Sequence, residues 1–386
     1  MKPSIPPFRA ILSPANLTRL TIATLAALNC AAMCADEPAV GAPQGSATTP
    51  YTPPTSTVPL PEFLRSPVPS ANGCGDGVPE GEIFANTPGL LDGLVLSGDW
   101  LYTAKYEAGA GLNAQPVGRF DLKQARPSLE PLQVSPSPWP NVAITDFDGK
   151  LFILGGAVVS KLYSVTHGNT APEVVGPVGA STLLAASPEL LLISGSPGCE
   201  PNTIYGVSKG GMTLDVIEQR DGCLDGIAAD SENIYWSEAV PLDTVFRGER
   251  TLYQRPLVGG APKALLSGTY EMEDLFVKGQ YVYLIANKGS SLVRVPKSGG
   301  APERVLQVPD YNLRVGTPYF DGDNLYLFHE CLTRWSPITG EITEIAASPT
   351  GYPRMFASSP NHGAFVVYLS RDTTAPKSWI TRLPTP

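Results

Sequence analysis

Short apolar runs separated by turn residues fill the chain from residue 88 onward, and the stretch from Gly226 to Gly268 shows the unit most clearly. Gly226–Ala229 is followed by an Asp-Ser-Glu-Asn turn and by Ile234–Glu238, whose β-branched and aromatic residues favour a strand. After a polar loop, Leu252–Leu257 and Lys263–Leu266 flank a Gly-Gly turn, where glycine supplies positive φ. The unit therefore predicts four short antiparallel strands.

The same unit recurs along the chain. Its turn and second strand occur at 97–105, 146–155, 187–195, 230–238, 278–286, 321–330 and 360–370. The spacing averages about 44 residues, which is typical of propeller blades. A β-sandwich would not repeat at this period, and no amphipathic helix of about ten residues or more follows residue 40. The pattern predicts an all-β fold: a seven-bladed β-propeller with four-stranded antiparallel blades.

The two ends of this region predict how the ring closes. The seventh unit supplies only three strands, near Arg354–Ala357, Ala364–Leu369 and Trp379–Leu383. Glu82–Ala85, just before the first blade, has no partner of its own. We therefore expect residues 82–85 to form the outermost strand of the last blade, which would remove an open sheet edge. The alternative is an irregular approach to the first blade.

The first 73 residues differ from the repeats. Lys2, Arg9 and Arg19 precede a short apolar run at Leu20–Leu28, and small residues follow, so we expect an export signal in residues 1–35 rather than a buried helix. Residues 36–73 are rich in Pro, Thr and Ser and predict an unfolded linker, either a stalk or a passive remnant. The propeller domain would then span residues 74–386.

Two groups of motifs resemble known families. NGCGDGVPEGE at 72–82 resembles the opening of the Cys-rich CGDGxxxxGExC repeat of exported bacterial proteins, although Ile83 and Phe84 stand where its next cysteine is expected. IYWSE at 234–238, with RPLVGGAP at 255–262 and RVPKSGGAP at 294–302, resembles blades of exported bacterial propellers and is distantly similar to YWTD-type propellers. The resemblance implies a protein in the periplasm, on the outer surface or outside the cell. It implies no single activity, because such propellers include receptor ectodomains, scaffolds, lyases and hydrolases.

The net charge and the N-terminal cysteines limit the classes of partner that we expect. A net charge of −9 argues against a nucleic-acid partner, which would need a basic stripe. Cys30 and Cys34 leave open a lipid anchor, which would be the chain's only link to a membrane, although neither follows the usual Leu-small-small triplet. We expect a monomer.

Four cysteines would remain after removal of the signal, and export favours disulfides. In a propeller the loop that carries Cys199 and the blade connection that carries Cys223 emerge on the same face, so we expect a Cys199–Cys223 disulfide. Such a bridge would be worth about 3 kcal/mol by the chain-entropy argument. Cys74 and Cys331 form the remaining pair, bridged or free. No CxxC or His-rich spacing supports a zinc site.

Histidine and aspartate positions give little support for catalysis or metal binding. His167 and His362 fall in turns, where we expect them to be solvated, and His329 ends a strand near a loop. The Asp-rich turns at 146–149 and 321–324 lack the ligand spacing of a calcium loop, so we expect hairpin turns and no cofactor, with Ca²⁺ as the alternative. There is no GxSxG or phosphate-loop motif, although a catalytic triad built from separate blades stays open.

Loops of different blades converge over the central channel on one face, where propellers commonly bind. Aromatic and arginine residues are typical interface anchors there. We define the predicted binding rim as Trp139, Asp221, Asp225, Glu238, Arg247, Tyr270, Glu271, Glu273, Tyr311, Arg314, His329, Tyr352 and Arg354. This set favours a binding or scaffold module for a protein or glycan at the cell surface. The alternative is an exported lyase or hydrolase with acidic residues and His329 at the channel mouth.

Overall fold

The computed structural model describes residues 81–88, 90–106, 117–133, 142–155, 160–179, 183–194, 202–239, 249–268, 272–286, 291–307, 319–328, 331–348, 350–370 and 377–383. The predicted export signal and linker lie outside these ranges. Within them, the regular structure is entirely β-strand, and no helix long and apolar enough to cross a membrane occurs.

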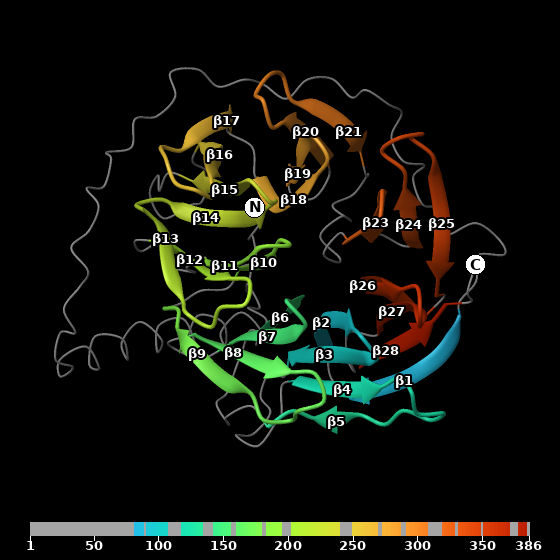
Figure 1. The fold of residues 1–386 in the computed structure, drawn as a ribbon. Coiled ribbons are helices and arrows are strands. Elements are labelled where there is room, and N and C mark those ends of the chain that lie inside the picture. Colours follow the sequence, from blue (N-terminus) through green and yellow to red (C-terminus); the bar gives the residue numbers. More distant parts are fainter. Residues whose placement is uncertain are drawn as a thin grey trace, which may run out of the picture. The chain divides into compact units, whose positions relative to one another are not determined.

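The strands form seven four-stranded antiparallel sheets, which surround a central channel as the blades of a β-propeller (Figure 1). From the innermost strand outward, blades 1 to 3 contain β2 (Leu90–Ser97), β3 (Trp100–Tyr106), β4 (Val117–Asp121) and β5 (Glu130–Pro131); β6 (Val142–Phe147), β7 (Lys150–Gly155), β8 (Lys161–Thr166) and β9 (Glu173–Pro177); and β10 (Leu183–Ala186), β11 (Leu190–Ser194), β12 (Asn202–Ser208) and β13 (Asp215–Arg220).

The remaining blades follow the same order. Blades 4 to 7 contain β14 (Cys223–Ala229), β15 (Asn233–Ala239), β16 (Arg250–Pro256) and β17 (Lys263–Gly268); β18 (Met272–Lys278), β19 (Tyr281–Ala286), β20 (Ser291–Pro296) and β21 (Glu303–Gln307); β22 (Tyr319–Asp321), β23 (Asn324–Phe328), β24 (Cys331–Trp335) and β25 (Ile342–Ala347); and β26 (Gly351–Ser359), β27 (Gly363–Ser370), β28 (Lys377–Arg382) and β1 (Glu82–Pro88). The predicted number of blades and of strands in each is confirmed.

The last blade is closed by the N-terminal strand, as the sequence predicts. β1 pairs with β28 in antiparallel register from Glu82↔Arg382 to Pro88↔Lys377, and Figure 1 shows the blue strand beside the red one. Phe84 lies edge-on to Phe120 of blade 1 and Phe365 of blade 7, with ring centroids 5.3 and 5.2 Å away. The closing strand therefore packs against both blades at the seam.

The second strand of each blade is apolar on both faces because a neighbouring blade covers each face. In β11, Leu191 and Ile193 pack in one cluster with residues of blade 2, while Leu190 and Leu192 pack in another with residues of blade 4. Successive side chains of a strand point to opposite faces. This explains why the sequence shows continuous apolar runs here instead of an alternating pattern.

The turns between first and second strands hold neighbouring blades together. Asp148 Oδ2 accepts a hydrogen bond from the Gly210 amide of blade 3 at 2.9 Å. Asp323 lies 3.3 Å from the Lys278 ammonium of blade 5, and Asp321 accepts a 2.6 Å hydrogen bond from the Ser358 hydroxyl of blade 7. The aspartates of these turns therefore have structural contacts between blades.

The two turn histidines are not the solvated side chains that we expected. His362 Nε2 lies 2.9 Å from Asp99 Oδ1 and joins blade 7 to blade 1. His167 lies 2.9 Å from the Tyr102 hydroxyl and 2.7 Å from the Ser97 hydroxyl, both in blade 1. The side chains are only 14% and 22% exposed, because turns of adjacent blades pack against each other.

Candidate binding site in the central channel

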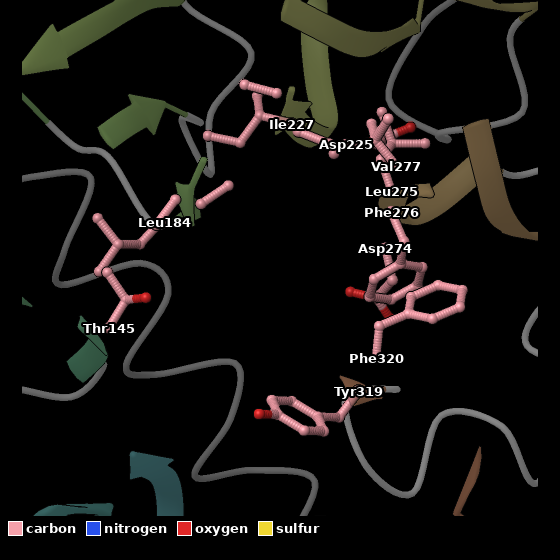
Figure 2. A pocket seen from close by; sticks show the side chains of 15 residues that line it. Thr145, Leu184, Asp225, Ile227, Asp274, Leu275, Phe276, Val277, Tyr319 and Phe320 are labelled. Carbon is pink, nitrogen blue, oxygen red and sulfur yellow. The ribbon is translucent and has the colours of Figure 1, made fainter. Parts of the chain in front are cut away.

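A cavity of about 400 Å³ lies in the central channel and is lined by residues of five innermost strands (Figure 2). These strands are β6, β10, β14, β18 and β22, from blades 2 to 6. Ligand sites in proteins are typically concave, largely apolar and of this size, with a few polar groups that orient the ligand. The cavity is therefore the first candidate for a functional site.

Asp225 reaches the cavity from a β-bulge in β14. Leu224 pairs with Glu238 and Gly226 with Ser237, so Asp225 is an extra residue in its strand. Bulges commonly re-aim a side chain next to a site. The Asp225 carboxylate accepts a hydrogen bond from Arg250 Nε at 2.6 Å, and both side chains are largely buried. The ion pair fixes this carboxylate at the cavity wall.

Asp274 lies in a second bulge, where the register of β18 shifts between Glu273 and Phe276. Its φ is +44°, a left-handed conformation that is uncommon outside glycine, although aspartate and asparagine adopt it more readily than most residues. Rare backbone conformations of this kind cluster at functional sites. Among the lining residues that the structure describes, Asp225 and Asp274 are the charged ones.

Aromatic rings form the wall next to Asp274. Phe276 and Phe320 lie edge to face, with centroids 6.3 Å apart, and Tyr319 lies beside Phe320 in β22. Figure 2 shows Tyr319 and Phe320 across the cavity from Thr145 and Leu184. Desolvation raises the pKa of the Tyr319 hydroxyl, so this group is a neutral hydrogen-bond donor at physiological pH. This wall therefore combines aromatic rings with the Tyr319 hydroxyl and the Asp274 carboxylate.

Bulged innermost strands recur around the ring. Register shifts also occur in β2, at Asp92, and in β26, at Arg354. Each of these residues and the two bulged aspartates of the cavity lies four or five residues before its strand ends. The sequence feature that these bulges share is a charged residue that interrupts an apolar first strand, as in Leu224-Asp225-Gly226.

The described part of the predicted binding rim is only partly gathered at the cavity. Asp225 lines it, Asp221 is exposed beyond the end of β13, and Tyr352 and Arg354 are half-buried in β26. Glu273 pairs with Ile285 directly before the bulge of β18. The other members lie outside the described residues and remain predictions: Trp139, Arg247, Tyr270, Glu271, Tyr311, Arg314 and His329.

Glu238 belongs to a contact between blades 3 and 4. Its side chain is 3% exposed, and its carboxylate accepts a hydrogen bond from Arg220 Nε at 2.8 Å. The Arg220 guanidinium also lies over the Tyr253 ring at 4.9 Å. This placement puts the Glu238 carboxylate inside the blade interface and not on the surface of the loop that follows β15.

Four further lining residues do not belong to the predicted binding rim. These residues lie on innermost strands, whereas the predicted rim consists mainly of loop residues: Asp274, Phe276, Tyr319 and Phe320. Aromatic residues in a strand are usually core, so their type alone does not separate a channel wall from a blade interface.

Comparisons with known proteins agree on the fold alone. No family model matches the chain, and no curated protein matches it. Among solved structures, the β-propeller domain of the Trilobed protease from Pyrococcus furiosus has a TM-score of 0.52 and 14% identity, over 77% of this chain and 98% of that one. A puromycin-hydrolyzing peptidase from Mycobacterium tuberculosis has a TM-score of 0.55 and 11% identity, over 80% of this chain and 56% of that one. At these identities the propeller fold is shared, and no activity follows.

Proposed function

We propose that this chain is an exported binding module whose partner, a protein or glycan at the cell envelope, inserts a group into the central cavity. The observation that carries the proposal is the preformed cavity of about 400 Å³ at the centre of the ring, whose lining is both polar and apolar. Three or more carboxylates, or His329 with a carboxylate, at the channel mouth would favour the alternative of a lyase or hydrolase. The described lining supplies two carboxylates, those of Asp225 and Asp274.

A blocked channel tests this proposal. Leu184→Trp would fill the cavity from the wall opposite Tyr319, while Val258→Trp places the same side chain in a turn where Val258 is 98% exposed. We expect the full chain to bind isolated envelopes of its host saturably, with binding lost in Leu184→Trp and retained in Val258→Trp. Equal binding by both variants, or no saturable binding by the unmodified chain, would contradict the proposal.

Export and the disulfide are part of the same proposal. Cys223 and Cys331 are both buried, and neither is a free thiol in the structure, which supports bridges to Cys199 and Cys74. Both of these partners lie outside the described residues. The intact mass of the mature protein from its host, before and after reduction, tests signal cleavage, lipid attachment and disulfide formation. A mass that matches cleavage near residue 35 would establish a soluble exported form, and added acyl groups would establish a lipid anchor. A gain of about 2 Da on reduction would establish each disulfide bridge. An uncleaved N-terminus would contradict export by this signal.

A further inference from the structure

The cavity walls combine aromatic faces with carboxylates. Phe276, Tyr319 and Phe320 line one side, and Asp274 lies among them in the close-up view (Figure 2). Asp225 belongs to the neighbouring wall. No lysine, arginine or histidine is among the described residues that line the cavity. The described wall is therefore acidic and aromatic.

We propose that the cavity binds an ammonium group carried on an apolar stem, such as the side chain of a lysine. This proposal rests on the proposed function and names the chemistry of the inserted group. A cation is attracted to the face of an aromatic ring and forms charge-assisted hydrogen bonds with a carboxylate. The apolar residues Leu184, Ile227 and Val277 would contact the stem.

The Asp225 carboxylate already has a cationic partner inside the protein. Arg250 approaches the carboxylate from within blade 4 and donates the 2.6 Å hydrogen bond. An anionic ligand would meet the carboxylates of Asp225, which has Arg250 as its counter-ion, and of Asp274, in a chain with a net charge of −9. An amino sugar has the cation but a polar ring, whose hydroxyls would lose hydrogen bonds to water against the aromatic wall.

Three compounds of matched size test the charge preference. Calorimetric titration of the full chain with phenethylammonium, 2-phenylethanol and phenylacetate compares a cation, a neutral alcohol and an anion on the same apolar stem. We expect the alcohol to bind about tenfold more weakly than the cation, and the anion not to bind. Glucosamine should also bind at least about tenfold more weakly than phenethylammonium.

Two variants locate the effect. Asp274→Asn removes the charge and keeps a residue that tolerates the positive φ, so we expect about tenfold weaker binding of the cation and unchanged binding of the alcohol. Phe320→Leu keeps an apolar side chain and removes the ring, with the same expected selectivity. Asp323→Asn, in a turn outside the cavity, is the matched control and should bind both compounds as the unmodified chain does.

The outcomes separate the two proposals. If the alcohol or the anion binds as tightly as the cation, and Leu184→Trp abolishes binding, the preference for ammonium is wrong while the cavity remains a site. If glucosamine binds as tightly as phenethylammonium, the proposed preference for an apolar stem is wrong. If no compound binds, or if Leu184→Trp binds all of them as the unmodified chain does, the cavity is not the site and both proposals fail.

Discussion

Arg250 and Asp225 join the third strand of blade 4 to its first strand through a 2.6 Å ion pair, and the carboxylate of this pair also lines the central cavity. The pair thus links the stability of one blade to the shape of the channel wall. Removing one partner of a largely buried pair leaves the other charge uncompensated, which costs more than the net worth of the pair.

Arg250→Met should lower the free energy of unfolding by about 3 kcal/mol, because the Asp225 carboxylate loses its guanidinium partner. Asp225→Asn combined with Arg250→Met should recover part of this loss. Urea denaturation of the single and double variants measures both. Lys209→Met, which breaks an exposed pair with Glu189, should change stability by less than about 1 kcal/mol. A loss of that small size in Arg250→Met would contradict the structural role of the pair.

Phe84→Ala should destabilise the ring at its seam. The ring of Phe84 contacts Phe120 of blade 1 and Phe365 of blade 7, so its removal leaves a void at the closure. We expect a loss of about 2–3 kcal/mol in chemical denaturation. Ile83 is the control, because it is 58% exposed in the same strand, and Ile83→Ala should cost less than about 0.5 kcal/mol. Similar losses in both variants would indicate that β1 does not pack between the two blades.

Tyr102 should make stability fall at alkaline pH. Burial raises the pKa of Tyr102 from 10.0 to about 12, although nearby Arg119 acts to lower it. The folded state therefore holds the phenolic proton more tightly than the unfolded state. This stabilisation is complete below about pH 10 and is lost as the pH rises through about 12.

Tyr102→Phe tests this dependence. The variant should lose a hydrogen bond to His167 at all pH values, but its stability should fall less steeply than that of the unmodified chain between about pH 10 and pH 12. Urea midpoints at several pH values measure the two slopes. Parallel slopes would show that Tyr102 titrates normally in the folded protein.

Gly222→Ala should disturb the contact between blades 3 and 4. A Cβ at this position would lie 2.5 Å from Cγ of Glu238 and 2.8 Å from the Ala239 carbonyl oxygen, so backbone or the buried ion pair must shift. We expect a loss of about 2 kcal/mol or more in urea denaturation. Gly176→Ala is the matched control, since its Cβ would meet only Leu214 at an ordinary 3.5 Å. No difference between the two variants would contradict the tight packing around Glu238.

The blades and their closure could be predicted because the relevant signals are local. Turn residues and apolar runs repeat once in each blade, the seventh unit supplies only three strands, and Glu82–Ala85 is a strand-like segment with no partner nearby in the sequence. The cavity could not be predicted in the same way. The bulges at Asp225 and Asp274 depend on strand pairing, which the period of a single strand does not reveal.

Contacts between distant segments account for the remaining differences. His167 and His362 occur in sequences typical of exposed turns, but their partners come from another blade. Glu238 ends the predicted strand and was expected at the binding rim, but its carboxylate is buried because its partner Arg220 ends a strand of the preceding blade. Polar residues in turns and loops indicate solvent exposure only where no neighbouring blade packs against them.

The pairing of β1 with β28 also sets an order of events in folding. β1 is among the first parts of the propeller to leave the ribosome, and its partner is among the last, about 300 residues later. The first strand must therefore stay unpaired while the other blades form, and its apolar Phe84 and exposed edge are open to other chains during that time. The β1–β28 pairing that closes the folded ring therefore makes the partly folded chain prone to aggregation. It also makes ring closure depend on a complete C-terminus.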